Sequence, residues 1–250
     1  MSTSLLLFSW NYTVKLSDCA VVSGIVQEQG SCSEHGGRTV NTPVERPEPT
    51  VVPMADMTSR QLIRRARIIE AVVELIGEVG ADAVQMRDVA QRSGVALATV
   101  YRYFSSKDHL LAAALEDWQK RLTRRVLASR GPKDPDPLPS VLDYLRRAQR
   151  AFHRNPEMTA LMLQTTRSTD PEARATIAKM NRTNTEMFNR LLDGVAPEDI
   201  PNITFGLNGA LTNSLAGVLA GMMTLEESLS RVEWVARVLL DATEARGTQP

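Results

Sequence analysis

The chain has 250 residues but only two cysteines and three histidines. Both cysteines, Cys19 and Cys32, precede residue 54, so a disulfide framework is excluded for the rest of the chain. The histidines are His35, His109 and His153, and none of them stands beside a cysteine or carboxylate at the spacing of a metal site. The sequence therefore predicts neither a metal ion nor a cofactor.

The motifs of catalysis and of membrane insertion are also missing. The sequence contains no glycine-rich phosphate loop, no nucleophile elbow and no paired carboxylates, so we predict that the protein is not an enzyme. It contains no run of about eighteen apolar residues, so we expect a cytoplasmic protein without a membrane span. The 29 basic and 29 acidic residues give a formal net charge of zero, which argues against indiscriminate coating of nucleic acid.

Residues 1–57 differ in composition from the rest of the chain. The apolar stretch LLLFSW is short and lacks a positively charged flank and a cleavage site, so no secretory signal is predicted. The following residues are rich in glycine, proline, serine and threonine without a period, which predicts disorder. Because Met54 and Met57 directly precede the first predicted helix, our hypothesis is that translation starts at one of them and that residues 1–57 are a disordered or misassigned extension.

Residues 84–111 carry the most informative pattern: a helix, a tight turn, a second helix and the start of a third. Val89 and Ala90 are expected to face inward, and Gly94 supplies the positive φ that a sharp turn between two helices requires. The second helix, at about 97–103, would then lie in a DNA major groove. A helix-glycine-helix corner alone also occurs in proteins that bind no DNA.

The outer face of this second helix suits contact with DNA. Thr99, Tyr101 and Tyr103 alternate with the apolar Val100 and Phe104, so we expect hydroxyls and aromatic edges to face outward, toward phosphates and base edges. The alternative for Tyr101 is a packing role. A lysine follows at the start of the next helix, where its ammonium and the exposed N–H groups together hold a backbone phosphate.

A supporting helix is predicted upstream, at about residues 60–79. Its apolar residues recur at helical spacing and form a packing face; they are Leu62, Ala66, Ile69, Val73 and Ile76. Basic charge is concentrated at its N-terminal end, in Arg60, Arg64, Arg65 and Arg67. Collectively these arginines are expected beside the DNA backbone, and the alternative for each of them is an ordinary solvated surface position.

Residues 60–111, and above all VQMRDVA and TVYRYFSSKDHLL, resemble the TetR family of bacterial transcriptional regulators. The resemblance implies a dimer on a palindromic operator. Carried over by position, it implies phosphate contacts at Thr99, Tyr103 and Lys107 and base-facing positions at Arg87, Leu97, Ala98 and Tyr101, to which we add Arg65. Leu97 and Ala98 are apolar, so recognition there rests on thymine methyl groups and backbone fit, and the operator sequence does not follow.

From Lys107 onward the chain is predicted to be helical throughout, with breakers between the helices. The fold class is therefore all-α, with a three-helix helix-turn-helix domain at 58–106 and a helical bundle for ligand binding and dimerisation at 107–250. The expected elements are helices 107–128, 140–153, 156 onward, 171–193, 203–221 and 225–245, with a proline-rich linker at 129–140. Asp170 and Thr224 are the predicted N-caps of two of them.

The predicted helix 203–221 is unusually rich in small residues, namely Gly206, Gly209, Ala210, Ala216, Gly217, Ala220 and Gly221. Because each glycine in a helix costs about 1 kcal/mol relative to alanine, close approach of another helix is expected to offset that loss. With the amphipathic last helix this segment would form a four-helix homodimer interface across a two-fold axis. A tight contact within one chain is the alternative.

A hydrophobic effector site is expected between the head and this interface. Methionines, which adapt their shape to a ligand, recur along two helix faces. The candidate effector-binding residues are Trp118, Phe152, Met158, Met162, Thr165, Met187 and Phe188. The alternative for each of them is core packing. An effector that fits only a state with displaced heads would shift the population off DNA.

The helix-turn-helix flank and the later HRNPEMTALM are similar to the KstR-type repressors of steroid catabolism. That resemblance implies an acyl-CoA or steroid-ring CoA thioester as effector and genes of lipid or cholesterol degradation as targets. Two alternatives stay open. A repressor of efflux or fatty-acid genes would keep the same head with a different pocket, and a helical dimeric scaffold would keep the dimer without binding DNA.

Overall fold

Residues 54–128 and 136–247 are described in a computed structural model of the chain. Within these ranges the chain is all-α, as predicted, with one short 3₁₀ helix (Met54–Asp56) and no strand. The helices are α1 (Ser59–Val79), α2 (Met86–Ser93), α3 (Leu97–Tyr103), α4 (Lys107–Ala128), α5 (Pro137–Arg154), α6 (Pro156–Thr165), α7 (Pro171–Leu191), α8 (Ile200–Leu219) and α9 (Leu225–Gly247). None of these helices is long and apolar enough to cross a bilayer. The predicted N-terminal extension up to residue 53 and most of the predicted linker lie outside the described residues.

Local caps set where several helices begin. Asp170 Oδ1 accepts a hydrogen bond from the Ala173 N–H at 2.7 Å, so the predicted cap of α7 is confirmed. The predicted cap of α9 is also confirmed, because Thr224 and Glu227 exchange backbone-to-side-chain hydrogen bonds of 2.8 and 3.2 Å.

The start of α5 was predicted too late. The helix begins at Pro137 rather than at residue 140, and the Asp136 carboxylate caps it by accepting a 2.8 Å hydrogen bond from the Leu138 N–H. Pro137 and Pro139 fall in the first turn, where backbone N–H groups have no partner within the helix. Prolines that we interpreted as a linker therefore open the helix instead.

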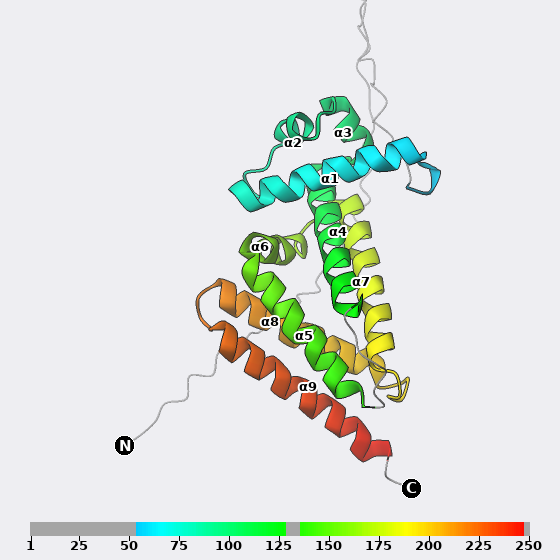
Figure 1. The fold of residues 1–250 in the computed structure, drawn as a ribbon, viewed down its shortest axis with the longest axis vertical. Coiled ribbons are helices and arrows are strands. Elements are labelled where there is room, and N and C mark those ends of the chain that lie inside the picture. The colour runs from blue at the N-terminus through cyan, green and yellow to red at the C-terminus, as the bar shows by residue number, and fades with distance from the viewer. Residues whose placement is uncertain (1–53, 129–135, 248–250) are drawn as a thin grey trace, which may run out of the picture. The chain divides into compact units, whose positions relative to one another are not determined.

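A first hydrophobic core joins α1, α2 and α3 to the N-terminal half of α4 and to Met158 and Leu161 of α6. Its largest fully buried side chains include Ile68, Ile76, Tyr103, Phe104, Leu110 and Leu115. Figure 1 shows α4 and α7 running side by side from α1 toward α8. The helix-turn-helix head is thus continuous in packing with the first turns of α4.

The packing face of α1 lies nearer its C-terminus than the spacing predicted. The buried residues of α1 all lie from Ile68 onward, whereas Leu62 and Ile63 are 42% and 57% exposed. Ala66 is exposed as well. Helical spacing alone fixes which residues share a face, but the length over which neighbouring helices cover that face is set by tertiary packing. The predicted face was therefore right for Ile69 and Ile76 and wrong for its first two turns.

A second core is built from α5, the end of α7, α8 and α9. In it α8 and α9 lie against each other, and Gly206 permits that contact, since a Cβ there would stand 2.8 Å from Leu239 Cδ1. Gly209, by contrast, has no atom within 4 Å of where its Cβ would be. Close approach within one chain therefore explains Gly206 but leaves Gly209 for another role.

Candidate nucleic-acid interface and ligand cavity

The corner between α2 and α3 has the geometry that the sequence predicts. Gly94 adopts φ 68° and ψ 29°, a left-handed conformation, and its N–H caps α2 by donating to Ala90 and Gln91 carbonyls. A Cβ on Gly94 would touch nothing, so the backbone conformation and not the space requires glycine. Val89 and Ala90 are buried beneath the corner, at 0% and 6% exposed.

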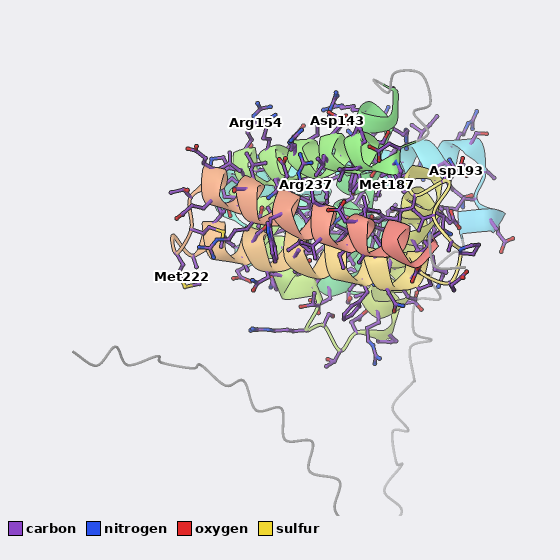
Figure 2. All side chains as sticks on the ribbon, turned by 90° about the horizontal axis from the view of Figure 1, so that it is seen from below. Asp143, Arg154, Met187, Asp193, Met222 and Arg237 are labelled. Carbon is purple, nitrogen blue, oxygen red and sulfur yellow. The ribbon has the colours of Figure 1, made fainter. Side chains whose placement is uncertain are left out.

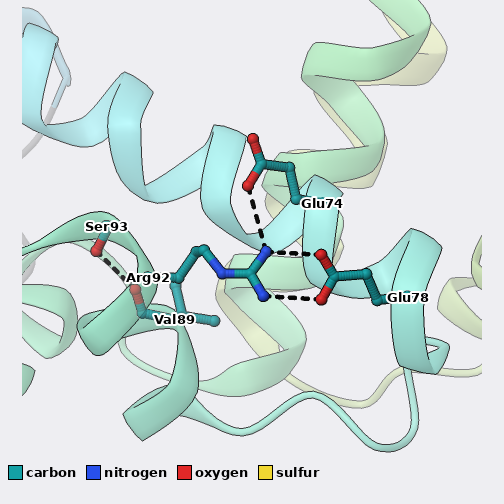
Figure 3. A network of polar contacts seen from close by, with 5 residues as sticks. All are labelled: Glu74, Glu78, Val89, Arg92 and Ser93. Carbon is teal, nitrogen blue, oxygen red and sulfur yellow. Dashed lines mark hydrogen bonds and ion pairs between the residues drawn. The ribbon is translucent and has the colours of Figure 1, made fainter.

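An ion-pair cluster holds α2 against α1 (Figure 3). The Arg92 guanidinium donates two parallel hydrogen bonds, 2.8 and 2.7 Å long, to the Glu78 carboxylate and approaches Glu74 at 3.4 Å. The hydrogen bonds from Arg92 lower the pKa of Glu78. Because these groups are exposed, the cluster fixes the orientation of α2 more than it stabilises the fold.

Most predicted DNA contacts lie at the accessible surface of the head. Ala98 is exposed, Tyr101 is 37% exposed, and Arg87 is exposed on α2. Leu97 and Thr99 are half-buried at the start of α3. These five residues, on α3 and on the first turn of α2, form an outer face of small, aromatic and cationic groups; we call it the reading face.

Tyr103 does not belong to the reading face, and its predicted outward position is wrong. The side chain is 1% exposed, and its hydroxyl has no hydrogen-bond partner among the described residues. The prediction followed an alternation of polar and apolar residues, which is the period of a strand. In a helix, residues three apart share a side, so Tyr103 follows the buried Val100 into the core.

Lys107 lies half-buried at the first residue of α4, beside the head. Its Nζ donates a 2.6 Å hydrogen bond to the Asp82 backbone carbonyl, in the turn between α1 and α2. The Asp82 carboxylate in turn accepts a 2.8 Å hydrogen bond from Gln164 Nε2 of α6. Lys107, which we predicted to contact a phosphate, therefore already has a hydrogen-bond partner inside the chain.

Arg65 lies against the junction of head and bundle instead of in an exposed basic stripe. Its guanidinium stands 5.0 Å from the centre of the Phe104 ring. Burial lowers the pKa of Arg65, and the nearby charges of Glu116 and Asp117 oppose that shift. The contact with Phe104, directly after α3, gives Arg65 a role within the fold.

A cavity of about 830 Å³ opens between α4, α5, α6, α7 and α8. Its apolar walls come from Leu122, Phe152, Met162, Ile177, Met180 and Leu211. Threonine and asparagine side chains from α7 and α8 line the rest, and its charged lining residues are Glu116, Lys120 and Arg124. The cavity lining therefore combines apolar, polar and charged side chains, which suits an amphipathic molecule.

Three of the seven predicted effector residues line the cavity: Phe152, Met162 and Thr165. The other four do not line it. Met158 belongs to the first core, and Met187 and Phe188 belong to the second, all 4% exposed or less. The Trp118 ring packs on the Phe152 ring at 4.9 Å, behind the cavity wall. The structure supports the core-packing alternative for these four residues. Residues that share a helix face by their spacing are divided between the core and the cavity, so spacing alone does not identify the cavity wall.

Several polar lining residues were missed from the sequence. Tyr144 is one of them, and burial raises its pKa to about 12, opposed by a hydrogen bond with Thr123. Asn184 Nδ2 donates to Asn208 Oδ1 at 2.9 Å and ties α7 to α8 at the cavity. A signal was available, since Asn181 and Asn184 lie one turn from the apolar Ile177 and Met180.

The outer face of α8 and α9, together with the turn between them, carries large apolar side chains on the surface. These are Phe205, Leu219, Met222, Trp234 and Val238, and they are 40–82% exposed. Figure 2 looks onto this side of the bundle, with Met222 at the turn and Arg237 on α9. Exposed apolar patches of this kind mark interaction surfaces.

The chain is similar in sequence to known proteins. Residues 68–114 match the family described as bacterial regulatory proteins, tetR family. The HTH-type transcriptional repressor KstR of Rhodococcus jostii RHA1 is 31% identical over 187 residues, covering 74% of this chain and 87% of the relative. The KstR repressor of Mycobacterium tuberculosis H37Rv is 29% identical over 178 residues, covering 71% of this chain and 80% of that protein.

Solved structures share the fold. A TetR transcriptional regulator from Rhodococcus sp. RHA1 superposes with a TM-score of 0.60 at 27% identity, covering 74% of this chain and 98% of that one. The regulator FadR from Bacillus subtilis, solved in complex with stearoyl-CoA, superposes with a TM-score of 0.56 at 17% identity, covering 70% of this chain and 97% of that one. The order of an N-terminal helix-turn-helix and a C-terminal helical domain is thus that of known regulators.

Proposed function

The chain belongs to the TetR family of bacterial transcriptional regulators and resembles KstR, and from this premise we propose that it is a repressor released from its operator by a bound effector. Regulators of this family bind operator DNA as dimers and are not enzymes. The single observation that carries the proposal is the presence, in one chain, of the reading face beyond the Gly94 corner and a cavity of about 830 Å³ below it.

The reading face is proposed to enter the major groove of a palindromic operator. Tyr101 and Ala98 would face base edges, Thr99 would meet a phosphate, and Arg87 would reach a base from α2. Lys107 would exchange the Asp82 carbonyl for a phosphate on binding. On this proposal Tyr101→Ala weakens operator binding by about 1–3 kcal/mol.

The homodimer is proposed to form through the outer face of α8 and α9. Two observations support this: the exposed apolar side chains gather there, and a Cβ at Gly209 of α8 would have no atom within 4 Å, which leaves room for a helix of a second copy. Two heads joined in this way would meet half-sites about one DNA turn apart. A regulator of chromosomal genes of this kind acts in the bacterial cytoplasm.

The effector is proposed to be a CoA thioester of a hydrophobic acid, with steroid-ring acids as the leading class. The apolar walls of the cavity would hold the ring system or acyl chain, and Lys120 and Arg124 would attract the anionic part. The KstR resemblance favours a steroid. The fold shared with FadR, solved with stearoyl-CoA, favours a fatty acyl chain as the second candidate.

The test is a gel-shift titration of the full chain against its own upstream intergenic DNA at fixed salt. It is run alone, with a steroid CoA thioester and with stearoyl-CoA. Specific binding released by the steroid thioester supports the leading proposal, and release by stearoyl-CoA alone supports the fatty-acid repressor. Binding without release by either would contradict the effector class. Absence of binding there and at other candidate operators would favour the dimeric scaffold.

A further inference from the structure

Glu116 of α4 is a buried carboxylate in the wall of the cavity, at 6% exposed. Two ammonium groups compensate its charge: Lys120 Nζ of the same helix at 2.7 Å and Lys179 Nζ of α7 at 3.3 Å. Burial pushes the pKa of Glu116 up, but the hydrogen bonds and charges of the two lysines lower it overall. The group is therefore ionised, and an ionised carboxylate accepts hydrogen bonds but donates none.

The two oxygens of this carboxylate are used unequally. Both lysines approach Oε1. Within residues 54–128 and 136–247, Oε2 accepts no hydrogen bond, and it is not one of the side-chain oxygens that are closed off without a partner, which are Tyr103 Oη, Asp117 Oδ2 and Thr204 Oγ1. Because Glu116 lines the cavity and is otherwise buried, the open side of Oε2 is the cavity itself.

Glu116 stands at the end of the cavity nearest the head. The residue before it, Leu115, belongs to the first core, and the cavity-lining Met162 and Met180 pack against that core. Along α4 the lining residues run from Glu116 to Arg124, which corresponds to a rise of about 12 Å. Arg124 is exposed. The α4 wall thus has a buried acceptor at one end and an exposed cation at the other.

A ligand that fills the cavity has to replace the water that solvates Oε2. A ligand of carbon alone leaves a charged acceptor without a donor, which is unfavourable. A ligand carbonyl at this point places a second acceptor against the carboxylate. An ammonium group is disfavoured as well, because Lys120 and Lys179 already stand beside Glu116. A neutral hydroxyl group donates to Oε2 and adds no charge.

We propose that Glu116 is a specificity-determining residue of the cavity and selects a ligand with a hydroxyl group on its apolar body. The hydroxyl donates to Oε2 at the end near the head, and the anionic part of the ligand lies toward Arg124. The proposal rests on the proposed role of the cavity as the effector site and names the effector class: a hydroxylated hydrophobic acid, bound in preference to its keto and unsubstituted analogues.

The experiment compares ligands that differ in one group. The first series is the CoA thioesters of lithocholic acid, of its keto derivative and of the parent cholanic acid, which carry a hydroxyl, a carbonyl or no oxygen at the ring end opposite the thioester. The second series is ω-hydroxystearoyl-CoA and stearoyl-CoA. Isothermal titration calorimetry of the full chain gives each Kd without DNA.

In at least one series the hydroxylated probe should bind at least about tenfold more tightly than its analogues, since a hydrogen bond to a charged group is at stake. Equal affinities within both series, or no binding of any probe, would overturn the proposal.

Glu116→Gln shows whether the selection comes from this carboxylate. The amide of glutamine both donates and accepts, so it serves a hydroxyl and a carbonyl alike. The affinity ratio of the hydroxyl to the keto probe should therefore fall to within about twofold. A merely structural role of Glu116 would weaken all probes by the same factor and leave this ratio unchanged, and that result would contradict the proposal. Glu116→Asp keeps an acceptor without a donor and should still bind the hydroxyl probe more tightly than the keto probe; loss of that order would contradict it too.

Asp117→Asn is the matched control. Asp117 is the neighbouring carboxylate of α4, lies 2.7 Å from Arg121 Nε and does not line the cavity. It should keep the wild-type ratio, and loss of the ratio in this variant would assign the selection to the general charge of α4 and overturn the role of Glu116. Circular dichroism checks that each variant is folded.

A gel shift separates this proposal from the repressor function. A wild-type protein that prefers the hydroxylated probe but binds no operator keeps the proposal and defeats the repressor function. A protein that binds its operator but shows no hydroxyl preference does the reverse.

Discussion

The head and the bundle below it are built on opposite principles. In the head, the apolar side chains of α1, α2 and α3 pack on one another, and residues such as Ile68, Val89 and Phe104 are fully buried. In the bundle, α4 and α7 pack side by side, but with α5, α6 and α8 they line a cavity of about 830 Å³ whose walls mix methionine, threonine, asparagine and charge. The difference teaches that reading DNA requires a rigid surface, whereas sensing a ligand requires packing that is left incomplete.

A pair of leucines on the same helix tests this difference most strongly. Leu115 of α4 is 0% exposed in the first core, and Leu122, two turns further along, lines the cavity. Leu115→Ala should lower the free energy of unfolding by about 2–5 kcal/mol, because it leaves a hole in close packing. Leu122→Ala should cost less than about 2 kcal/mol, because it only enlarges existing space. Urea unfolding followed by circular dichroism measures both, and equal losses would refute the comparison.

Two glycines of the head separate backbone conformation from space. A Cβ would touch nothing at Gly94 or at Gly77, but Gly94 has φ 68° whereas Gly77 is helical. Gly94→Ala should therefore cost about 1–2 kcal/mol through its left-handed backbone. Gly77→Ala should stabilise the protein by about 0.5–1 kcal/mol through helix propensity. Thermal unfolding of both variants gives the values, and a neutral Gly94→Ala would mean that the corner tolerates another conformation.

Tyr103 tests whether the head reads DNA only with its outer face. Its hydroxyl is buried and has no hydrogen-bond partner in residues 54–128 and 136–247, so Tyr103→Phe should leave stability unchanged or raise it by about 1 kcal/mol. Operator affinity should stay at the wild-type value. A loss of affinity in Tyr103→Phe, measured by gel shift at two salt concentrations, would restore the phosphate contact that we predicted from the sequence and would require α3 to rotate on binding.

Tyr103 also shows how much of the head could be predicted from the sequence. The corner was predictable because one residue, Gly94, fixes a local backbone angle, and caps such as Asp170 and Thr224 were predictable for the same local reason. The orientation of Tyr103 was misjudged because a polar-apolar alternation was followed inside a helix. Orientation in α3 depends on how that helix rotates against α1, which is a tertiary property.

The cavity was less predictable than the head. Met158 and Met162 stand one turn apart on α6 and have the same chemistry, yet the first is in the core and the second lines the cavity. A cavity is the space that packing leaves open, so no local pattern marks its edge. The ion pair Glu116–Lys179 joins residues distant in sequence, so no local pattern predicts it.

The smallest expected effect is a pH dependence of the stability, caused by His109 at the boundary between head and bundle. The side chain is 7% exposed beside Phe104, and its Nδ1 lies 3.3 Å from Ser105 Oγ. Burial lowers the pKa of His109 below its ordinary 6.5; Glu172 and Asp170 of α7 oppose the shift, and Arg65 of α1 adds to it.

The sign follows from proton uptake. Below about pH 6.5 the unfolded chain takes up a proton at this histidine that the folded chain does not. The stability contribution of His109 is therefore complete above that pH, falls as the pH drops toward the lowered folded value, and is constant again below it. Asn in place of His109 keeps a hydrogen-bonding group near Ser105 but cannot titrate, so His109→Asn should flatten the pH profile of the urea midpoint below pH 6.5. His153→Asn, at an exposed histidine of α5, is the matched control. If the urea midpoint of His109→Asn depends on pH as steeply as that of wild type, another titratable group causes the pH dependence.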